Sequence, residues 1–182
     1  MLALVRHGET DWNSAGRLQG RTDIPLNDLG RRQANDAGAA LAAQDWDLLV
    51  SSPLRRAVET AEIIGGHVGL DLSLTIPDLI ERDFRGAEGS VLLGMEREDI
   101  DKLLLVSESE AEVAARSVDA LQQLVRENAG RRIIVVAHGT LIRVTMGLLR
   151  GEPHAHVLNC ETIELEPDLL MGFEPEPEAA IR

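Results

Sequence analysis

The chain of 182 residues has few aromatic residues and one cysteine, Cys160. It contains no Tyr, two Trp and two Phe, so the core must be aliphatic, and the stacking surfaces that bind single-stranded nucleic acid are scarce. A single cysteine excludes a disulfide within the chain and disfavours a thiolate zinc site. This cysteine usage is compatible with a reducing compartment, and we expect the protein to be cytoplasmic.

Long apolar runs are also missing. The four apolar residues before Arg6, Leu2–Val5, are too few for the apolar region of a signal peptide. No window approaches the ~18 uninterrupted apolar residues of a membrane-spanning helix. The sequence therefore predicts neither a signal peptide nor a membrane span.

Positive charge is scarce as well. The chain has 31 acidic residues against 18 Lys and Arg, a net charge of −13. This balance excludes a general nucleic-acid binder, which needs a basic face, and it disfavours an anionic membrane surface as a partner. The charge is uneven, because residues 1–66 carry 7 Arg against 9 acids, a net −2, and residues 67–182 carry the other −11. We therefore expect a small anionic substrate, held by a local group of arginines.

Short apolar runs alternate with segments of helical periodicity. The predicted strands are Leu2–Val5, Leu48–Val50, Leu72–Ile76, Ile133–Ala137, Thr162–Leu165 and Leu169–Phe173. The predicted helices are Leu29–Ala43, Leu54–Ile64, Ser109–Asn128 and Thr140–Leu149. The alternation predicts an α/β three-layer sandwich, with a mostly parallel central sheet and helices on both faces.

We expect one domain over residues 1–182, a length that one domain commonly has. The stretch at about 85–108 breaks the alternation and is predicted to be a short cap insertion over one end of the sheet. The acidic, proline-broken tail at 174–182 is predicted to be frayed. A homodimer formed through the late edge strands is left open.

Three predicted strands end in residues that suit an anion. The first runs into Arg6-His7-Gly8, the second into Ser51–Arg56, and the Ile133–Ala137 strand into His138-Gly139. Ligands of open α/β sheets lie beyond the carboxyl ends of the strands, where helix N-termini add N–H donors. The sequence therefore predicts a phosphate site with two histidines and at least two arginines, in which a histidine could act as nucleophile.

Taken together, these segments resemble the histidine phosphatase superfamily, in the phosphoglycerate mutase-like branch. The matching segments are VRHGETDWN (5–13), LQGRTDIPLNDLGRRQA (18–34), SSPLRRAVETA (51–61), LIERDF (79–84) and VVAHGTLIR (135–143). They occur in the family's order and extend over nearly the whole chain.

The resemblance assigns roles to individual residues. His7 is the nucleophile that becomes phosphorylated, and Glu81 aligns with the acid/base carboxylate. Arg6, Arg56 and His138 clamp the phosphoryl oxygens. The substrate-contacting residues that it implies are Asn13, Gln19, Gly20, Arg21 and Gly139. It implies no metal and no cofactor, because the arginines neutralise the charge of the phosphoryl group.

Some residues lie outside this pattern. Related sequences usually follow the acid with F-G-x-W-E-G, whereas here the segment is FRGAEG (84–89), with no Trp and a shifted Gly. This departure puts the setting of Glu81 in doubt, and Arg85 could contact the substrate instead. We expect His67, His154 and His156 at the surface. Arg143 is expected near the site or in a structural ion pair.

The expected function is hydrolysis of the phosphomonoester of a small metabolite through a phosphohistidine intermediate. The alternative is phosphoryl transfer of the phosphoglycerate mutase type. That reaction needs a second basic cluster, whereas residues 94–110 hold six acids against Arg97 and Lys102. A non-catalytic phosphate-binding module is a further alternative. The intact set of site residues argues against it.

Overall fold

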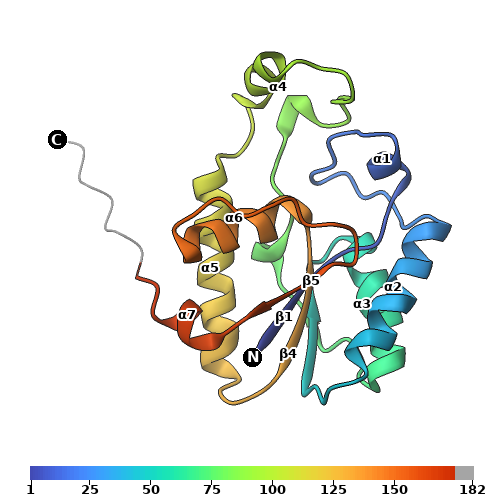
Figure 1. The fold of residues 1–182 in the computed structure, drawn as a ribbon, viewed down its shortest axis with the longest axis vertical. Coiled ribbons are helices and arrows are strands. Elements are labelled where there is room, and N and C mark those ends of the chain that lie inside the picture. Colours follow the sequence, from blue (N-terminus) through green and yellow to red (C-terminus); the bar gives the residue numbers. More distant parts are fainter. Residues whose placement is uncertain (175–182) are drawn as a thin grey trace.

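The computed structural model describes residues 1–174, and a five-stranded sheet forms its centre (Figure 1). The strands are β1 (Leu2–Arg6), β2 (Leu48–Ser51), β3 (Leu74–Thr75), β4 (Ile133–Ala137) and β5 (Thr162–Leu165). Their spatial order is β3-β2-β4-β1-β5, with β1 to β4 parallel and β5 antiparallel to β1. The mostly parallel sheet of the prediction is confirmed.

Helices cover both faces of this sheet (Figure 1). One face carries α2 (Asp28–Leu41) and α3 (Arg55–Val68), and the other carries α5 (Glu110–Glu127), α6 (Gly139–Arg150) and α7 (Pro167–Met171). Two short helices, α1 (Asp11–Ser14) and α4 (Arg97–Leu104), lie beyond the carboxyl ends of the parallel strands. Two 3₁₀ turns, η1 (Pro77–Leu79) and η2 (Arg85–Ala87), precede α4 along the chain.

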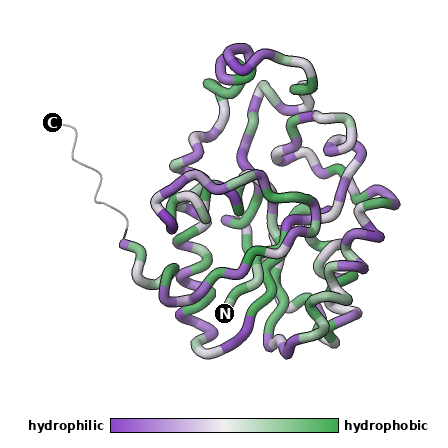
Figure 2. Tube along the Cα trace, viewed as in Figure 1, coloured by the Kyte–Doolittle hydropathy of each residue, from purple (hydrophilic) through white to green (hydrophobic). Residues whose placement is uncertain are grey.

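Alternate residues of each central strand enter different cores. In β1, Leu2 and Leu4 pack against α5 and α6, whereas Ala3 and Val5 pack against α2 and α3. Because both faces are covered, the central strands are apolar up to the last residue, Arg6 in β1 and Ser51 in β2, as the colour in Figure 2 shows for most of their length. This is why short continuous apolar runs, rather than alternating ones, mark the strands in the sequence.

One predicted strand is wrong. Leu169–Phe173 was expected to be extended, but Pro167–Met171 forms α7 instead. Periodicity cannot separate a short apolar run in a strand from one in a helix. Pro167 stands at the first helical position, where its fixed φ favours a helix and its missing N–H costs nothing. The remaining predicted strands and helices are present, although β3 is only two residues long.

The stretch at 85–108, which we term the cap segment, contains η2 and α4 and lies beyond the carboxyl edge of the sheet (Figure 1). Its backbone pairs with the 16–18 loop, since Leu18 N–H donates to Ser90 O and Leu92 N–H to Gly16 O. Of the tail predicted at 174–182, only Glu174 lies within the described residues. Across residues 1–174, no helix is both long and apolar enough to span a membrane.

Candidate active site

The predicted anion-binding segments meet at one edge of the sheet. β4 lies between β1 and β2, so the carboxyl ends of these three strands are adjacent. His7 directly follows β1 and its N–H donates to Ala137 O, the last residue of β4. Ser52 directly follows β2 and its N–H donates to Val136 O. Three segments far apart in the sequence are thereby brought together.

His7 is held as a neutral imidazole with one defined tautomer. Its Nδ1–H donates to the carbonyl of Gly8 at 2.7 Å, and its Nε2 accepts from Nε of Arg56 at 3.2 Å. Both contacts require the lone pair on Nε2. Burial, together with the charges of Arg56 and Arg6, holds the pKa of His7 well below its usual value. The ring is therefore uncharged at neutral pH and its free lone pair is on Nε2.

Arg56, in the first turn of α3, is fully buried. Besides His7, its guanidinium donates to Thr22 O at 3.0 Å and to Gly20 O at 2.7 Å. Burial lowers the pKa of Arg56 to about 10, so the group is still a cation at neutral pH. One side chain thus connects the histidine with the 20–22 loop.

Arg6 extends from the end of β1 towards α6. Its Nη1 donates to Val157 O at 2.7 Å and to Nε2 of His156 at 3.2 Å. Its Nε is buried next to Gly139, where a Cβ atom would lie only 3.1 Å from Nε. The absence of a side chain at Gly139 lets the guanidinium lie against the start of α6.

His138 lies beside His7, with ring centroids 5.2 Å apart and an interplanar angle of 61°. Its Nε2 contacts Ser52 Oγ at 2.7 Å. If Ser52 donates this bond, the ring hydrogen is on Nδ1. Burial is the main cause that holds the pKa of His138 well below its usual value, and Arg56 adds to it.

Three buried nitrogens at the site have no hydrogen-bond partner among the described residues. They are Arg6 Nε, His138 Nδ1 and Gln19 Nε2. Unpaired buried polar groups are rare in folded proteins, and each requires an explanation. A phosphoryl group, whose oxygens accept hydrogen bonds, fits Arg6 Nε–H and Gln19 Nε2–H, and it fits His138 Nδ1 in the tautomer with the hydrogen on that atom.

Glu81 faces the N-terminus of α6. Its Oε2 accepts from Thr140 N–H at 3.0 Å, and its Oε1 accepts from Leu141 N–H at 3.1 Å and from Arg82 N–H at 2.8 Å. The side chain is buried and lines the same cleft as His7. The structure therefore brings the predicted acid next to the predicted nucleophile.

Gln19 and Asn13 belong to a polar network on the other side of the cleft. Gln19 Oε1 accepts from the hydroxyl of Thr10 at 2.6 Å and from Asn13 Nδ2 at 3.1 Å, which leaves its Nε2 as the unpaired donor. Asn159 donates both to His7 O and to Asn13 Oδ1. Thr10 and Asn159 are not among the site residues predicted from the sequence.

The cleft between these groups has a volume of about 140 Å³. This is below the ~300–1,000 Å³ of pockets for larger ligands and suits a small group. The predicted site residues that line it are Arg6, His7, Asn13, Gln19, Glu81 and Gly139. Arg17 and Arg143 line it as well, and so does His156, which is exposed as expected. Arg143 also pairs with Glu110.

Three residues expected to contact the substrate are placed differently in the structure. Arg21 is exposed and pairs with Asp83 at 3.4 Å, outside the cleft. Gly20 contributes its carbonyl to Arg56 and donates its N–H to Glu88 at 3.1 Å, so it shapes the loop. Arg85 is exposed and is not among the residues that line the cleft.

Comparison with known proteins agrees with this geometry. A model of the histidine phosphatase superfamily (branch 1) matches residues 2–168. The chain is 37% identical over 150 residues to the uncharacterized phosphatase PhoE of Bacillus subtilis, covering 82% of this chain and 77% of that protein. It is 36% identical over 155 residues to the metal-independent phosphoserine phosphatase of Arabidopsis thaliana, covering 78% of this chain and 65% of that protein.

Among solved structures, a mycobacterial glucosyl-3-phosphoglycerate phosphatase in complex with VO3 is similar. The TM-score is 0.78 and the identity 31%, over 87% of this chain and 89% of that chain. The family match, the relatives and the shared fold lead to one conclusion. The chain belongs to the histidine phosphatase superfamily, branch 1.

Proposed function

We propose that the protein hydrolyses phosphate monoesters of small metabolites through a phosphohistidine formed at Nε2 of His7. The observation that carries this proposal is the state of His7. It is a buried, neutral imidazole whose lone pair on Nε2 meets Nε–H of Arg56. Buried nitrogens without a protein partner belong to Arg6 and Gln19, which line the cleft with His7, and to His138, whose ring lies against His7.

In the first step, Nε2 of His7 attacks phosphorus and the bond from phosphorus to the ester oxygen breaks. Arg6, Arg56 and His138 donate to the phosphoryl oxygens, whose negative charge they stabilise. Glu81 gives a proton to the departing alkoxide. In the second step a water molecule attacks phosphorus, the phosphorus–nitrogen bond breaks, and Glu81 takes the proton of that water.

The cap segment favours water over a second phosphorylated acceptor. A mutase must hold a bisphosphorylated intermediate and needs a second group of free cations. The two bases of α4 are already paired, Arg97 with Asp101 at 2.8 Å and Lys102 with Glu98 at 2.8 Å. The exposed acids around them repel a second phosphate. This supports hydrolysis rather than phosphoryl transfer between two hydroxyls.

The proposed partner is a small molecule. The cleft is small, and Arg6, Arg17 and Arg143 line it against one carboxylate, that of Glu81. The net charge of −13 repels large polyanions such as nucleic acids. We also propose a cytoplasmic location, based on the single cysteine. The homodimer stays a prediction, which light scattering of the purified protein tests.

The test of the proposed function is turnover of p-nitrophenyl phosphate in the presence of EDTA. The wild type is expected to be active, and His7→Ala is expected to be inactive. His67→Ala is a matched control, because His67 is exposed on α3 and, within residues 1–174, its ring hydrogen-bonds only to Asn35. Activity that survives in His7→Ala contradicts the phosphohistidine, and activity lost on chelation contradicts a metal-independent reaction.

A single-turnover experiment separates the hydrolase from the mutase. The enzyme is first phosphorylated by a labelled ester and is then given an excess of a phosphorylated hydroxyl acceptor such as 3-phosphoglycerate. We expect the label to appear as inorganic phosphate. Transfer of most of the label to the acceptor would instead support the mutase.

A further inference from the structure

The segment that carries Glu81 has little regular structure of its own. It lies between η1, which ends at Leu79, and η2, which begins at Arg85. In such a stretch the carbonyl groups need partners from elsewhere, since unpaired buried backbone groups are costly. The Glu81 carboxyl accepts from N–H groups at the start of α6 and from Arg82 N–H, and the backbone that carries it is set by what binds these carbonyls.

Arg116, on α5, supplies these partners. Its Nη1 donates to Asp78 O at 2.6 Å and to Ile80 O at 2.7 Å. Its Nη2 donates to the carbonyl of Glu81 itself at 3.2 Å. A single guanidinium thus binds three carbonyls over four consecutive residues.

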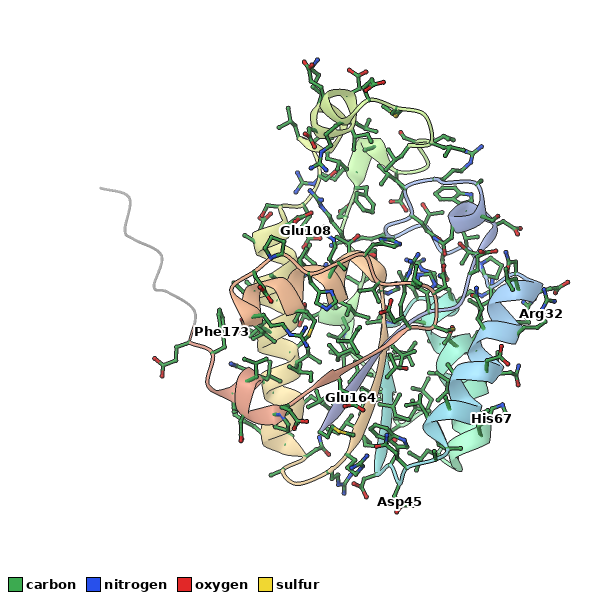
Figure 3. The ribbon with its side chains drawn as sticks, viewed as in Figure 1. Arg32, Asp45, His67, Glu108, Glu164 and Phe173 are labelled. Carbon is green, nitrogen blue, oxygen red and sulfur yellow. The ribbon has the colours of Figure 1, made fainter. Side chains whose placement is uncertain are left out.

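Glu108, at the end of the cap segment, holds Arg116 from the other side. Its carboxylate accepts from Nε and Nη2 of Arg116 at 2.8 and 3.1 Å. This bidentate ion pair fixes the plane of the guanidinium. The same carboxylate accepts from Asp83 N–H at 2.9 Å, and Glu108 O accepts from Nε of Arg82 at 2.6 Å. Figure 3 shows Glu108 where α5 meets the cap segment.

Glu108 is ionised in this arrangement. Burial by itself raises its pKa, but the hydrogen bonds from Arg116 and Asp83 outweigh burial and lower the pKa below its ordinary value. The backbone on both sides of Glu81 is therefore bound by one partly buried ion pair, made of an α5 arginine and a cap-segment carboxylate.

We propose that Arg116, held by Glu108, is a positioning residue that aims the Glu81 carboxyl at the leaving-group oxygen and at the attacking water. This inference rests on the proposed function, in which Glu81 is the acid and base. The proposal also explains how Glu81 is positioned in a chain that lacks the Trp of the F-G-x-W-E-G motif, because Arg116 on α5 holds the backbone of Glu81. Arg116 itself does not touch the reacting atoms.

The chemistry of the leaving group gives a specific test. p-Nitrophenolate leaves without a proton, whereas an alkyl phosphate such as glycerol phosphate needs one from Glu81. Arg116→Lys keeps the charge and removes the fork of donors. We expect a near-normal initial burst of nitrophenolate, followed by a steady-state rate that falls by about tenfold to hundredfold and by accumulation of phosphoenzyme. Turnover of glycerol phosphate falls without a burst.

A double-mutant cycle shows whether Arg116 acts through Glu81. Glu81→Gln, Arg116→Lys and the double variant are compared, with Arg126→Lys, an exposed arginine of the same helix, as the control. The double variant is expected to be no slower than Glu81→Gln alone. Glu108→Gln is a second way to loosen the contact and should give the same burst pattern if Arg116→Lys folds poorly.

The outcomes separate the two proposals. If Glu81→Gln is as active as the wild type, both the role of Glu81 and its positioning are overturned. If Glu81→Gln is slow but Arg116→Lys and Glu108→Gln are fully active, only the positioning is overturned. The same holds if the defects of Glu81→Gln and Arg116→Lys multiply in the double variant.

Discussion

Nε of Arg56 donates a hydrogen bond to Nε2 of His7 across 3.2 Å. In the proposed reaction Nε2 is the atom that attacks phosphorus. Before substrate binds, the contact with Arg56 therefore keeps the His7 ring in the orientation that it needs. When the nitrogen–phosphorus bond forms, the lone pair is consumed and the N–H of Arg56 is free to turn to a phosphoryl oxygen. One donor thus serves the imidazole first and the transferred group afterwards.

The first prediction concerns this contact. Arg56→Lys keeps a cation but loses the Nε–H and the fork that also binds the 20–22 loop. We expect kcat for p-nitrophenyl phosphate to fall by about 10²–10³, the loss typical of removing one donor to a developing charge. Arg55→Lys is the matched control, because Arg55 is exposed one position earlier on α3. Equal kcat values for the two variants would contradict the assignment.

The second prediction concerns stability against pH. His7 and His138 have pKa values well below 6.5 in the folded chain, whereas in the unfolded chain they titrate near 6.5. The unfolded state therefore binds more protons as the pH falls below about 6.5, so stability is fully present above that pH and decreases below it. Each histidine contributes a slope of up to about 1.4 kcal/mol per pH unit.

Urea unfolding between about pH 7.5 and pH 5 measures this slope. His7→Asn should decrease the slope by the contribution of about one proton, because it removes one of the histidines whose pKa is lowered by folding. The lowered pKa of Glu108 does not change this slope. A carboxylate with a lowered pKa stabilises the fold at all pH values above its ordinary pKa of 4.5, and this stabilisation is lost only below that pH. Equal stability of the wild type at both ends of the range is the contrary result.

The third prediction tests the approach of Arg6 to α6. In Gly139→Ala the new methyl group would lie 3.1 Å from Nε and 3.3 Å from Cδ of Arg6. The guanidinium must shift by a few tenths of an ångström, and we expect kcat to decrease by about tenfold while stability changes little. Gly66→Ala, exposed within α3 with no atom near the added Cβ, should keep full activity and gain ~0.5–1 kcal/mol. Wild-type kcat for Gly139→Ala would show that the contact is unimportant.

The fourth prediction concerns the backbone of the cap segment. Arg85 has φ 49°, in the left-handed region that favours glycine, and it occupies the position at which related sequences have Gly. Arg85→Gly should therefore increase the free energy of unfolding by about 1 kcal/mol. Gly89→Ala, at φ 81° and 3.2 Å from Trp12, should decrease it. A lower urea midpoint for Arg85→Gly would contradict the strain.

The main site could be predicted because it depends on the sheet. Ile133–Ala137 was predicted to the residue, since a β-branched run buried on both faces has few alternatives, and His138 follows it at the carboxyl edge. His7 likewise follows a buried apolar strand, β1, at the same carboxyl edge of the sheet. Arg56 was identified by resemblance to the family, whose motif distinguishes it from Arg55.

The remaining contacts depend on tertiary structure that no local pattern encodes. His156 lies in a loop with exposed neighbours and reaches Arg6 from 150 positions away. Arg116 looks like any other arginine on an amphipathic helix, and only the folded chain shows that it faces the backbone around Glu81. Arg21 was expected at the substrate and pairs instead with Asp83, because the loop that follows Glu81 places this acid next to it.

One wall of the cleft rests on an apolar cluster that is much smaller than the two cores of the sheet. The apolar cluster under the cap segment has only three buried members, Leu18, Phe84 and Ala87, and it is separate from the two cores of the sheet. So small a cluster opens at a lower free energy than the whole fold. Leu18 and Phe84 also line the cleft. Substitutions at these two residues are therefore expected to change how often this small cluster opens. The cap segment and its cluster can therefore change in sequence, and alter substrate selectivity, while the sheet that carries His7 and His138 keeps its stability.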